Sequence, residues 1–307
     1  MERLLITLIL VCTMNNITNA QNPFYGQYHT PHEAVPFDRI ETEHYEPAIL
    51  EGIKLQNAEI EAIIQNPEKA DFTNTIEAFE ESGKLLDKVV AVFGNMLSAE
   101  TNDDLQELAQ KIMPLLSEHS NNITLNEKLF ARVKEVYNQK ETLQLTQEQK
   151  QLLENAYNSF IRHGANLEGE AREEYRRLTT ELSKLTLTFS ENNLKETNAY
   201  QMLLTKKESL AGLPEIIIEA AAETAKNEEK EGWAFTLHAP SYIPFMTYSD
   251  NRDLRQKLYM AYNTKCTHDN EFNNIDIVKK IANTRMKIAQ LLGYKDYAEY
   301  TLKKRMA

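Results

Sequence analysis

Residues 171–189, AREEYRRLTTELSKLTLTF, carry the clearest periodicity in the chain. Within this stretch, apolar residues return at alternating steps of four and three positions, which is the repeat of one face of an α-helix. The residues on that face are Ala171, Tyr175, Leu178, Leu182, Leu185 and Phe189. Most of the residues between them are charged or polar, so the stretch predicts an amphipathic helix that buries one stripe against other helices.

Several stretches before it show the same pattern. Thr73 or Thr75 is expected to cap one helix, and Thr146 with Gln149 has the spacing of a capping box that opens another. Between these caps, one helix is expected to bury a seam at nearly coiled-coil spacing, formed by Phe79, Leu86, Val90, Phe93 and Leu97. Together the stretches predict an antiparallel helical bundle over residues 46–205.

Residues 206–307 are expected to begin a second helical region of different character. Trp233–Leu237 alternates bulky and small residues and predicts a short strand, with a possible partner strand at Met202–Thr205. Helices are expected to resume after Asn251 and near Asp296. The predicted fold class is therefore mainly α, with a short β segment near residues 233–237.

The amino-acid composition favours long helices and argues against a nucleic-acid partner. The 307 residues include only 9 Gly and 9 Pro, so helix-breaking residues are sparse. The formal net charge of −12 gives a broadly acidic surface that repels phosphate backbones, so we expect no nucleic-acid partner.

Residues 1–20 have the features of a secretory signal peptide. Leu4–Val11 is an apolar run too short to span a bilayer, and Thr18-Asn19-Ala20 offers small residues at a cleavage site. We expect an exported, periplasmic protein without a membrane span. A lipid anchor at Cys12 is the less favoured alternative, because the residues before it are not small.

Residues 21–45 are predicted to form an extended polar arm that is interrupted by prolines. The arm holds the only cluster of histidines, in which His29, His32 and Glu33 resemble a crude metal chelate. A solvated arm with a proline turn is the favoured interpretation.

No self-sufficient catalytic site is evident in the sequence. The chain has no His-Glu-x-x-His, no Gly-x-Ser-x-Gly and no phosphate-binding glycine loop. Cys266 is expected to be a small buried side chain, and His268 two positions later does not complete a zinc site. We therefore predict no catalytic and no metal-binding residue in this chain, and the substrate-binding residues stay unknown.

Ten short segments, taken in order, carry a resemblance to a known family. They are PFDRI (36–40), HYEPA (44–48), IEAI (60–63), FTNTIEA (72–78), LNEKLFARVK (125–134), FSEN (189–192), LAGLP (210–214), WAFTL (233–237), NRDLR (251–255) and LLGY (291–294). In order and spacing they resemble the N-terminal region of the thimet-oligopeptidase-like zinc metallopeptidases. The bacterial peptidyl-dipeptidase branch is the most similar, with oligopeptidase A as its sibling, and the resemblance covers about residues 22–307.

The resemblance implies an elongated, channel-containing helical fold in which residues 46–205 form a wall of the channel. It also implies a zinc site in the family's C-terminal half, where a His-Glu-x-x-His helix supplies two metal ligands and the general base. No position of this sequence matches that motif. Zinc is thus the implied cofactor, its ligands are not in this chain, and residues 206–307 are expected to stop before the zinc-binding domain.

Two hypotheses follow from these observations. In the first, the chain is the N-terminal part of an exported zinc peptidase that releases C-terminal dipeptides from oligopeptides, and the chain alone is inactive. In the second, it is a non-catalytic helical module that binds peptides or acts as a scaffold. Dipeptidyl carboxypeptidase versus endo-oligopeptidase specificity, peptide preference and oligomeric state stay open, as does whether the gene truly ends at Ala307.

Overall fold

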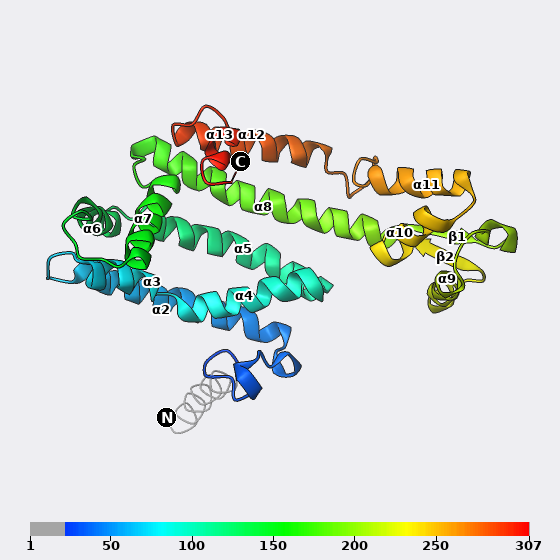
Figure 1. Cartoon of the computed structure of the whole chain (residues 1–307), viewed down its shortest axis with the longest axis horizontal. Coiled ribbons are helices and arrows are strands. Elements are labelled where there is room, and N and C mark those ends of the chain that lie inside the picture. The colour runs from blue at the N-terminus through cyan, green and yellow to red at the C-terminus, as the bar shows by residue number, and fades with distance from the viewer. Residues whose placement is uncertain (1–21, 307) are drawn as a thin grey trace, which may run out of the picture. The chain divides into compact units, whose positions relative to one another are not determined.

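A computed structural model describes residues 22–306 of the chain, and the predicted signal peptide lies outside them. The described part is mainly helical with one small sheet, as predicted (Figure 1). It divides into two compact units. Unit 1 contains the described residues up to Ser183 and those from Met286 onward, and unit 2 contains Lys184–Arg285.

Unit 1 is built from helices throughout. Its elements are α2 (Tyr45–Gln65), α3 (Ala78–Glu80), α4 (Lys84–Ala99), α5 (Asp103–Thr124), α6 (Glu127–Asn138), α7 (Gln147–Arg162), the first part of α8 (Gly169–Ala199), the last part of α12 (Ile275–Leu291), and α13 (Tyr297–Leu302). The predicted capping box is present at the start of α7, where the Gln149 amide N–H donates to Thr146 Oγ1 and the Gln149 side chain accepts from the Thr146 amide. Local sequence therefore sets where these helices begin.

The largest core of unit 1 is formed by α2, α6, α7 and the turn before α3. Aromatic rings fill its centre, with the ring centroid of Phe160 5.4 Å from that of Phe79 and 5.7 Å from that of Phe130. The aliphatic members of this core include Ile63, Ile76, Leu129, Val133 and Leu153. Burial of these side chains supplies the main stabilisation of the bundle.

The predicted cap at Thr73 or Thr75 is wrong. The cap is Asp71. Its carboxylate accepts the backbone N–H of Asn74, and the side-chain oxygen of Asn74 accepts the backbone N–H of Asp71. Residues Phe72–Glu77 then form a short π-helix, and Thr75 is buried within it. Sequence spacing favoured a hydroxyl cap, but a reciprocal Asp–Asn pair satisfies both backbone donors.

The predicted seam of the next helix is also shifted. Helix α3 ends at Glu80, and Gly83, which has a left-handed φ of +79°, is the N-cap of α4, so no continuous helix runs from Phe79 to Leu97. In α4 the buried residues are Leu86, Val89, Val92 and Phe93, whereas Val90 and Leu97 are only partly buried. The turn at Gly83 resets the helical phase, which explains the offset.

The stripe of α8 is buried unevenly. Tyr175 and Leu178 lie in a small core with Leu125 and Ile288, which joins α8 to the end of α5 and to α12 within unit 1. Phe189, later on the same stripe, is 37% exposed. The clearest periodicity in the sequence therefore predicted the helix correctly, but only its first half packs as that stripe implies.

The C-terminal segment of unit 1 is held by a reciprocal contact between α7 and α13. The guanidinium of Arg162 lies 4.1 Å from the ring centroid of Tyr300 and donates to its carbonyl at 3.1 Å. Asp296 caps α13 by accepting the backbone N–H of Glu299, and the helix begins near the predicted position. The cation–π contact and the hydrogen bonds together fix α13 to the bundle.

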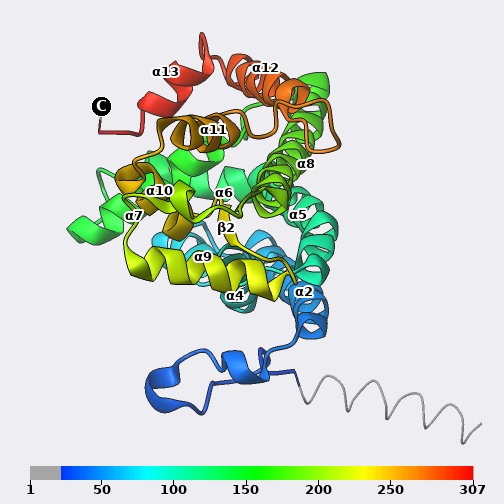
Figure 2. The same cartoon turned by 90° about the vertical axis from the view of Figure 1, so that its right-hand side faces the viewer.

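Unit 2 contains the predicted sheet. Strands β1 (Gln201–Leu204) and β2 (Trp233–Thr236) pair antiparallel, with Met202 opposite Phe235. Helices α9 (Glu215–Asn227), α10 (Ala239–Tyr248) and α11 (Arg252–Asn263) complete the unit, together with the adjoining parts of α8 and α12 (Figure 2). Phe235 and Phe245 meet edge to face at 4.6 Å in its core.

Close backbone approaches shape the loops of unit 2. Gly212 has φ of +86°, and a Cβ atom there would lie 2.3 Å from the Tyr248 carbonyl oxygen. The Asp250 amide donates to the Ala211 carbonyl, so the loop after β1 packs directly on the end of α10. Only glycine fits this position without displacing backbone.

The arm is not uniformly extended as predicted. Between residues 31 and 44 it contains three single-turn 3₁₀ helices, η1 (Pro31–Glu33), η2 (Phe37–Arg39) and η3 (Thr42–His44). Phe24 is fully buried and begins a chain of ring contacts that continues through Tyr45 to Phe93 on α4. From the polar composition of the arm, the burial of Phe24 was not predicted.

Candidate functional site

The histidine cluster of the arm forms no metal site. His29, His32 and Glu33 are exposed, and no group of three His, Cys, Asp or Glu side chains within residues 22–306 is arranged to hold a metal ion. His32 and Glu33 have positive φ angles of 58° and 55°, which turn the chain within η1. This segment therefore forms a tight turn.

Three other histidines have structural partners. His44 accepts the Glu41 amide at Nδ1 and helps to start η3, and the His163 ring contacts the Ser159 carbonyl at the end of α7. His119 is buried, with its Nε2 2.7 Å from Gln56 Oε1, and burial lowers the pKa of this imidazole. Each contact completes a helix end or a core hydrogen bond.

The most concentrated polar cluster in unit 2 centres on Glu196 of α8. Its carboxylate accepts the backbone N–H of Cys266 and lies 2.6 Å from His268 Nδ1. Cys266 has a left-handed φ of 59°, and its carbonyl accepts the Asn274 amide at 2.7 Å. These bonds fix the loop between α11 and α12 onto α8.

This cluster lacks the electrostatics of a cysteine nucleophile. Burial, followed by the neighbouring Glu196 carboxylate, raises the pKa of the Cys266 thiol to about 11. A thiol with so high a pKa stays protonated at neutral pH, and the thiolate is the reactive species. Cys266 is 4% exposed and behaves as the small buried side chain that the sequence predicted.

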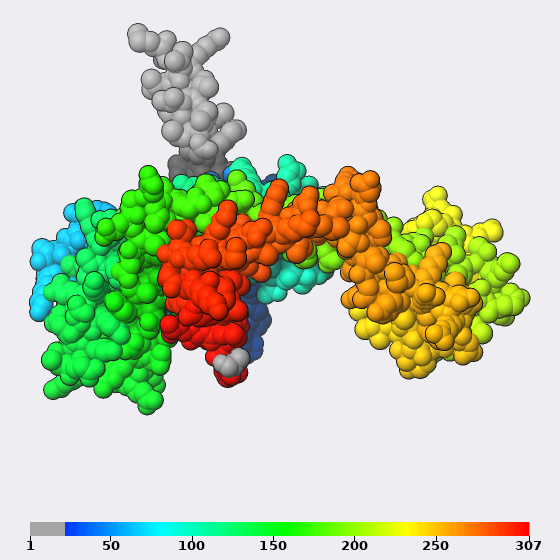
Figure 3. Space-filling model, turned by 90° about the horizontal axis from the view of Figure 1, so that it is seen from above, coloured from blue at the N-terminus to red at the C-terminus, as the bar shows by residue number. Residues whose placement is uncertain are grey.

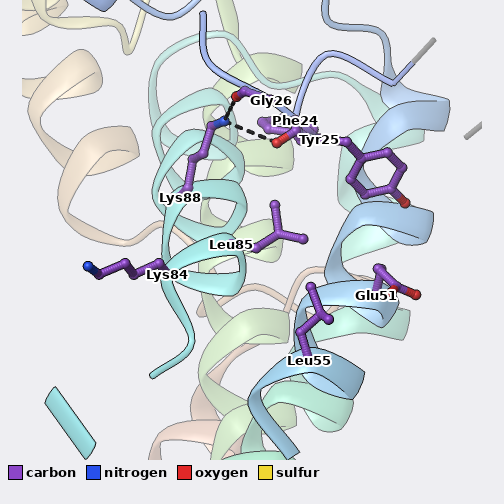
Figure 4. Close-up of a pocket in the computed structure, with 8 residues that line it drawn as sticks. All are labelled: Phe24, Tyr25, Gly26, Glu51, Leu55, Lys84, Leu85 and Lys88. Carbon is purple, nitrogen blue, oxygen red and sulfur yellow. Dashed lines mark hydrogen bonds between the residues drawn. The ribbon is translucent and has the colours of Figure 1, made fainter. Parts of the chain in front are cut away.

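A pocket of about 530 Å³ in unit 1 lies between the arm, α2 and α4 (Figure 4). Leu55 and Leu85 line it from the two helices, with Tyr25 from the arm. The Lys88 ammonium closes one side, where it donates to the carbonyls of Phe24 and Gly26 at 3.0 and 2.6 Å. The figure shows this lysine reaching from α4 to the arm.

Most of the charged groups that line the pocket already have partners. Glu51 pairs with Lys54, and Lys84 pairs with Glu81. Burial lowers the pKa of Lys88, whose ammonium also lies 4.0 Å from the centroid of the Tyr28 ring. The lining contains no nucleophile beside a base, so the pocket can accept an apolar group but has no machinery for hydrolysis.

Membrane-spanning helices are also not found: within residues 22–306, none combines the length and the apolar character that a span requires. The described part of the chain thus presents helix caps, core contacts and the apolar pocket beside Lys88. No group of three His, Cys, Asp or Glu side chains among the described residues is placed to hold a metal ion.

Comparison with known proteins finds similarity to one family of peptidases. The sequence model of "Peptidase family M3" matches residues 245–307. The dipeptidyl carboxypeptidase of Escherichia coli K12 is 35% identical over 287 residues, which cover 93% of this chain and 42% of the relative. The oligopeptidase A of Salmonella typhimurium is 30% identical over 290 residues, with the same two coverages. The chain is similar to members of peptidase family M3.

Similarity extends to a plant relative of the same kind. The probable cytosolic oligopeptidase A of Arabidopsis thaliana is 27% identical over 300 residues, covering 94% of this chain and 42% of the relative. The chain thus spans about two fifths of the length of the M3 relatives that it matches. The resemblance found in the ten short sequence segments is confirmed at the level of the family.

The sequence did not predict two features of the structure: the cluster around Glu196 and Cys266, and the pocket beside Lys88. Glu196 and Cys266 are 70 residues apart, and no local pattern links a helical glutamate to a distant loop. The pocket depends on Lys88, which reaches back 62 residues to Gly26. The one sequence signal of the contact between Lys88 and the arm was Phe24, an aromatic residue within the polar arm.

Proposed function

We propose that the chain is the N-terminal part of an exported zinc metallopeptidase that hydrolyses oligopeptides and releases C-terminal dipeptides. The observation that carries the proposal is the 35% identity to a dipeptidyl carboxypeptidase across 93% of the chain. Oligopeptidase A relatives at about 30% identity support the same peptide substrates with a different cleavage position.

The proposed role of this part is to bind and confine short peptides, with the chemistry supplied elsewhere. The helical bundle of unit 1 is well packed around its aromatic core, which suits a rigid wall. The sequence has no His-Glu-x-x-His and no Gly-x-Ser-x-Gly motif that would supply a hydrolytic site of its own. We therefore expect the chain alone to be inactive.

Zinc does not fit the described residues. No group of three His, Cys, Asp or Glu side chains in this part of the chain is placed to hold it, although a catalytic zinc site needs three protein ligands. We place the metal and its ligands in the part of the M3 module that this chain does not match, which is more than half of the relatives' length.

Export is proposed on the signal-peptide pattern of residues 1–20 alone. The expected cleavage follows Ala20, two residues before Asn22, whose side chain donates to the His44 carbonyl at 2.9 Å. N-terminal sequencing of the protein recovered from the periplasm of a bacterial host tests this. Recovery of the intact precursor from the cytoplasm would contradict it.

The catalytic proposal is tested by completing the module. The chain is fused to the part of the E. coli dipeptidyl carboxypeptidase that it does not match. The fusion is expected to release dipeptides from the C-terminus of a blocked oligopeptide, and a zinc chelator is expected to abolish the activity. The isolated chain is the control and should show none.

Two results would decide against the catalytic proposal. A soluble fusion that binds zinc but leaves peptides intact would refute it. Peptide binding by the isolated chain, without hydrolysis by the fusion, would favour the second hypothesis of a non-catalytic peptide-binding module.

A further inference from the structure

Exposed apolar side chains are concentrated in the segment that matches the family. Sixteen large hydrophobic residues are exposed among the described residues, and nine of them lie within residues 245–306. This segment is little more than a fifth of the described chain, so it holds far more than its share. Apolar surface gathered in one segment marks an interaction site more often than scattered single residues do.

The same segment also has a distinct charge. Residues 245–307 contain twelve Lys and Arg against seven Asp and Glu, whereas the rest of the chain contains 22 against 39. A strongly acidic protein thus carries one basic stretch. Seven of these Lys and Arg residues, against five Asp and Glu, lie in unit 2, so its part of the stretch is slightly basic. Charge complementarity favours an acidic surface as its partner.

Two tyrosines of this segment in unit 2, Tyr259 and Tyr262, lie near Tyr242, which precedes the segment by three residues. We call these three tyrosines the tyrosine face. The rings of Tyr242 on α10 and Tyr262 on α11 stack at 4.3 Å. The pKa of Tyr242 is raised by burial and then by Tyr262 and Tyr259, which places all three phenols within electrostatic reach of one another.

The face is exposed and preorganised. Tyr259 and its neighbour Met260 are 50% and 49% exposed, and Tyr262 is 39% exposed. The Lys265 ammonium lies 4.5 Å from the Tyr262 ring centroid, and α11 presents its residues on the surface in view in Figure 3. Stacked tyrosines lose little conformational freedom on binding.

The composition of α11 is that of an interface and not of a solvated helix. It combines Tyr259, Met260 and Tyr262 with Arg252 and Arg255. Tyrosine, methionine and arginine are enriched at the centres of protein interfaces, where a few such residues contribute most of the binding energy. Only Leu258 of α11 is buried within unit 2, so the helix contributes little to the unit's own core.

We propose that the tyrosine face is a docking surface for the remaining, catalytic part of an M3 peptidase module, through a partner surface that is apolar at its centre and acidic at its rim. The proposal rests on the proposed function. The occupant is inferred from the lengths: more than half of the dipeptidyl carboxypeptidase lies outside the part that this chain matches, and the family match begins at Phe245, within α10.

The test supplies that part as a separate polypeptide. The portion of the E. coli dipeptidyl carboxypeptidase that this chain does not match is purified and titrated with the chain, at low and high NaCl. We expect a complex whose dissociation constant rises with salt. Tyr259→Ser should raise the dissociation constant by roughly tenfold or more. Ile216→Ser, at a 72% exposed position on α9 of the same unit, is the matched control and should leave it unchanged.

A second measurement uses the covalent fusion, in case the separate portion does not fold. Hydroxyl-radical oxidation of Tyr259 and Met260 should be several-fold slower in the fusion than in the isolated chain, while exposed Phe37 reacts equally in both. Equal oxidation of Tyr259 and Met260 in a soluble fusion would overturn the proposal.

Sedimentation of the isolated chain separates the other occupants. A dimer of the chain that Tyr259→Ser dissociates would assign the face to a second copy and overturn the proposal. Binding without hydrolysis would keep the docking surface and refute the proposed function. Hydrolysis by a fusion in which Met260 is oxidised as fast as in the isolated chain would support the proposed function and refute the docking surface.

Discussion

The bundle helices of unit 1 and helix α11 of unit 2 have the same amphipathic sequence pattern, but their apolar faces differ in burial. In the bundle, the apolar stripes of α2, α6 and α7 close on one another around Phe130 and Phe160. In α11, Leu258 alone is buried, and the tyrosines beside it face solvent. An amphipathic pattern predicts that a helix has an apolar face, but it does not say whether the partner of that face lies in the same stretch of chain.

The largest expected effect comes from opening the bundle core. Phe160→Ala removes a ring that is 1% exposed and contacts two other aromatic rings, so we expect a loss of about 3–5 kcal/mol in the free energy of unfolding. Urea unfolding followed by circular dichroism measures it. Tyr259→Ala on α11 is the contrasting variant, and a loss as large as that of Phe160→Ala would erase the distinction between the two regions.

The next effect concerns the loop that leads from α11 to α12. Glu196→Gln weakens its bonds to the Cys266 amide and to His268, and charge-assisted hydrogen bonds of this kind contribute about 1.5–3 kcal/mol. Thermal unfolding of the variant at neutral pH measures the loss. His268→Gln is the paired variant, and it should remove only part of the effect because the amide bond remains.

The same glutamate gives the loop a pH dependence. Burial raises the pKa of Glu196, but the hydrogen bonds from His268 and Cys266 outweigh burial and hold the pKa below its ordinary value of 4.5. The stabilisation is therefore present above pH 4.5 and is lost as the pH falls through the lower folded pKa. Glu196→Gln should flatten this acid limb, and an unchanged acid limb would show that other carboxylates cause it.

A smaller effect compares equivalent caps in the two regions. Asn102 caps α5 in the bundle and Asn251 caps α11, each through its side-chain oxygen. Substitution of either by Ala should cost about 1 kcal/mol. Hydrogen exchange should place the loss in α5 for the first variant and in α11 for the second. Loss of protection across both regions in either variant would mean that the units do not open separately.

These caps also mark how much of the fold sequence alone could predict. Asn102, Asn251 and Asp296 act within three residues of the amides they satisfy, so local spacing was enough. The seam of α4 was misplaced because the left-handed Gly83 resets the helix, and this depends on backbone conformation. The strand at Trp233 was predicted from alternation alone and is present.

The candidate sites were harder to predict for a physical reason. The bond from Cys266 to Glu196 and the reach of Lys88 to the arm join residues more than 60 positions apart. Contacts at that separation depend on tertiary packing, which no local pattern encodes. The prediction that this chain contains no catalytic or metal-binding residue was made from missing motifs and stays a prediction.

We propose that this chain supplies a structural part of a peptidase whose metal ligands lie in the part of the relatives that the chain does not match. The most direct measurement is the zinc content of the purified chain together with its hydrolysis of a blocked oligopeptide. We predict no stoichiometric zinc and no hydrolysis. One tightly bound zinc per chain with chelator-sensitive cleavage would contradict the claim.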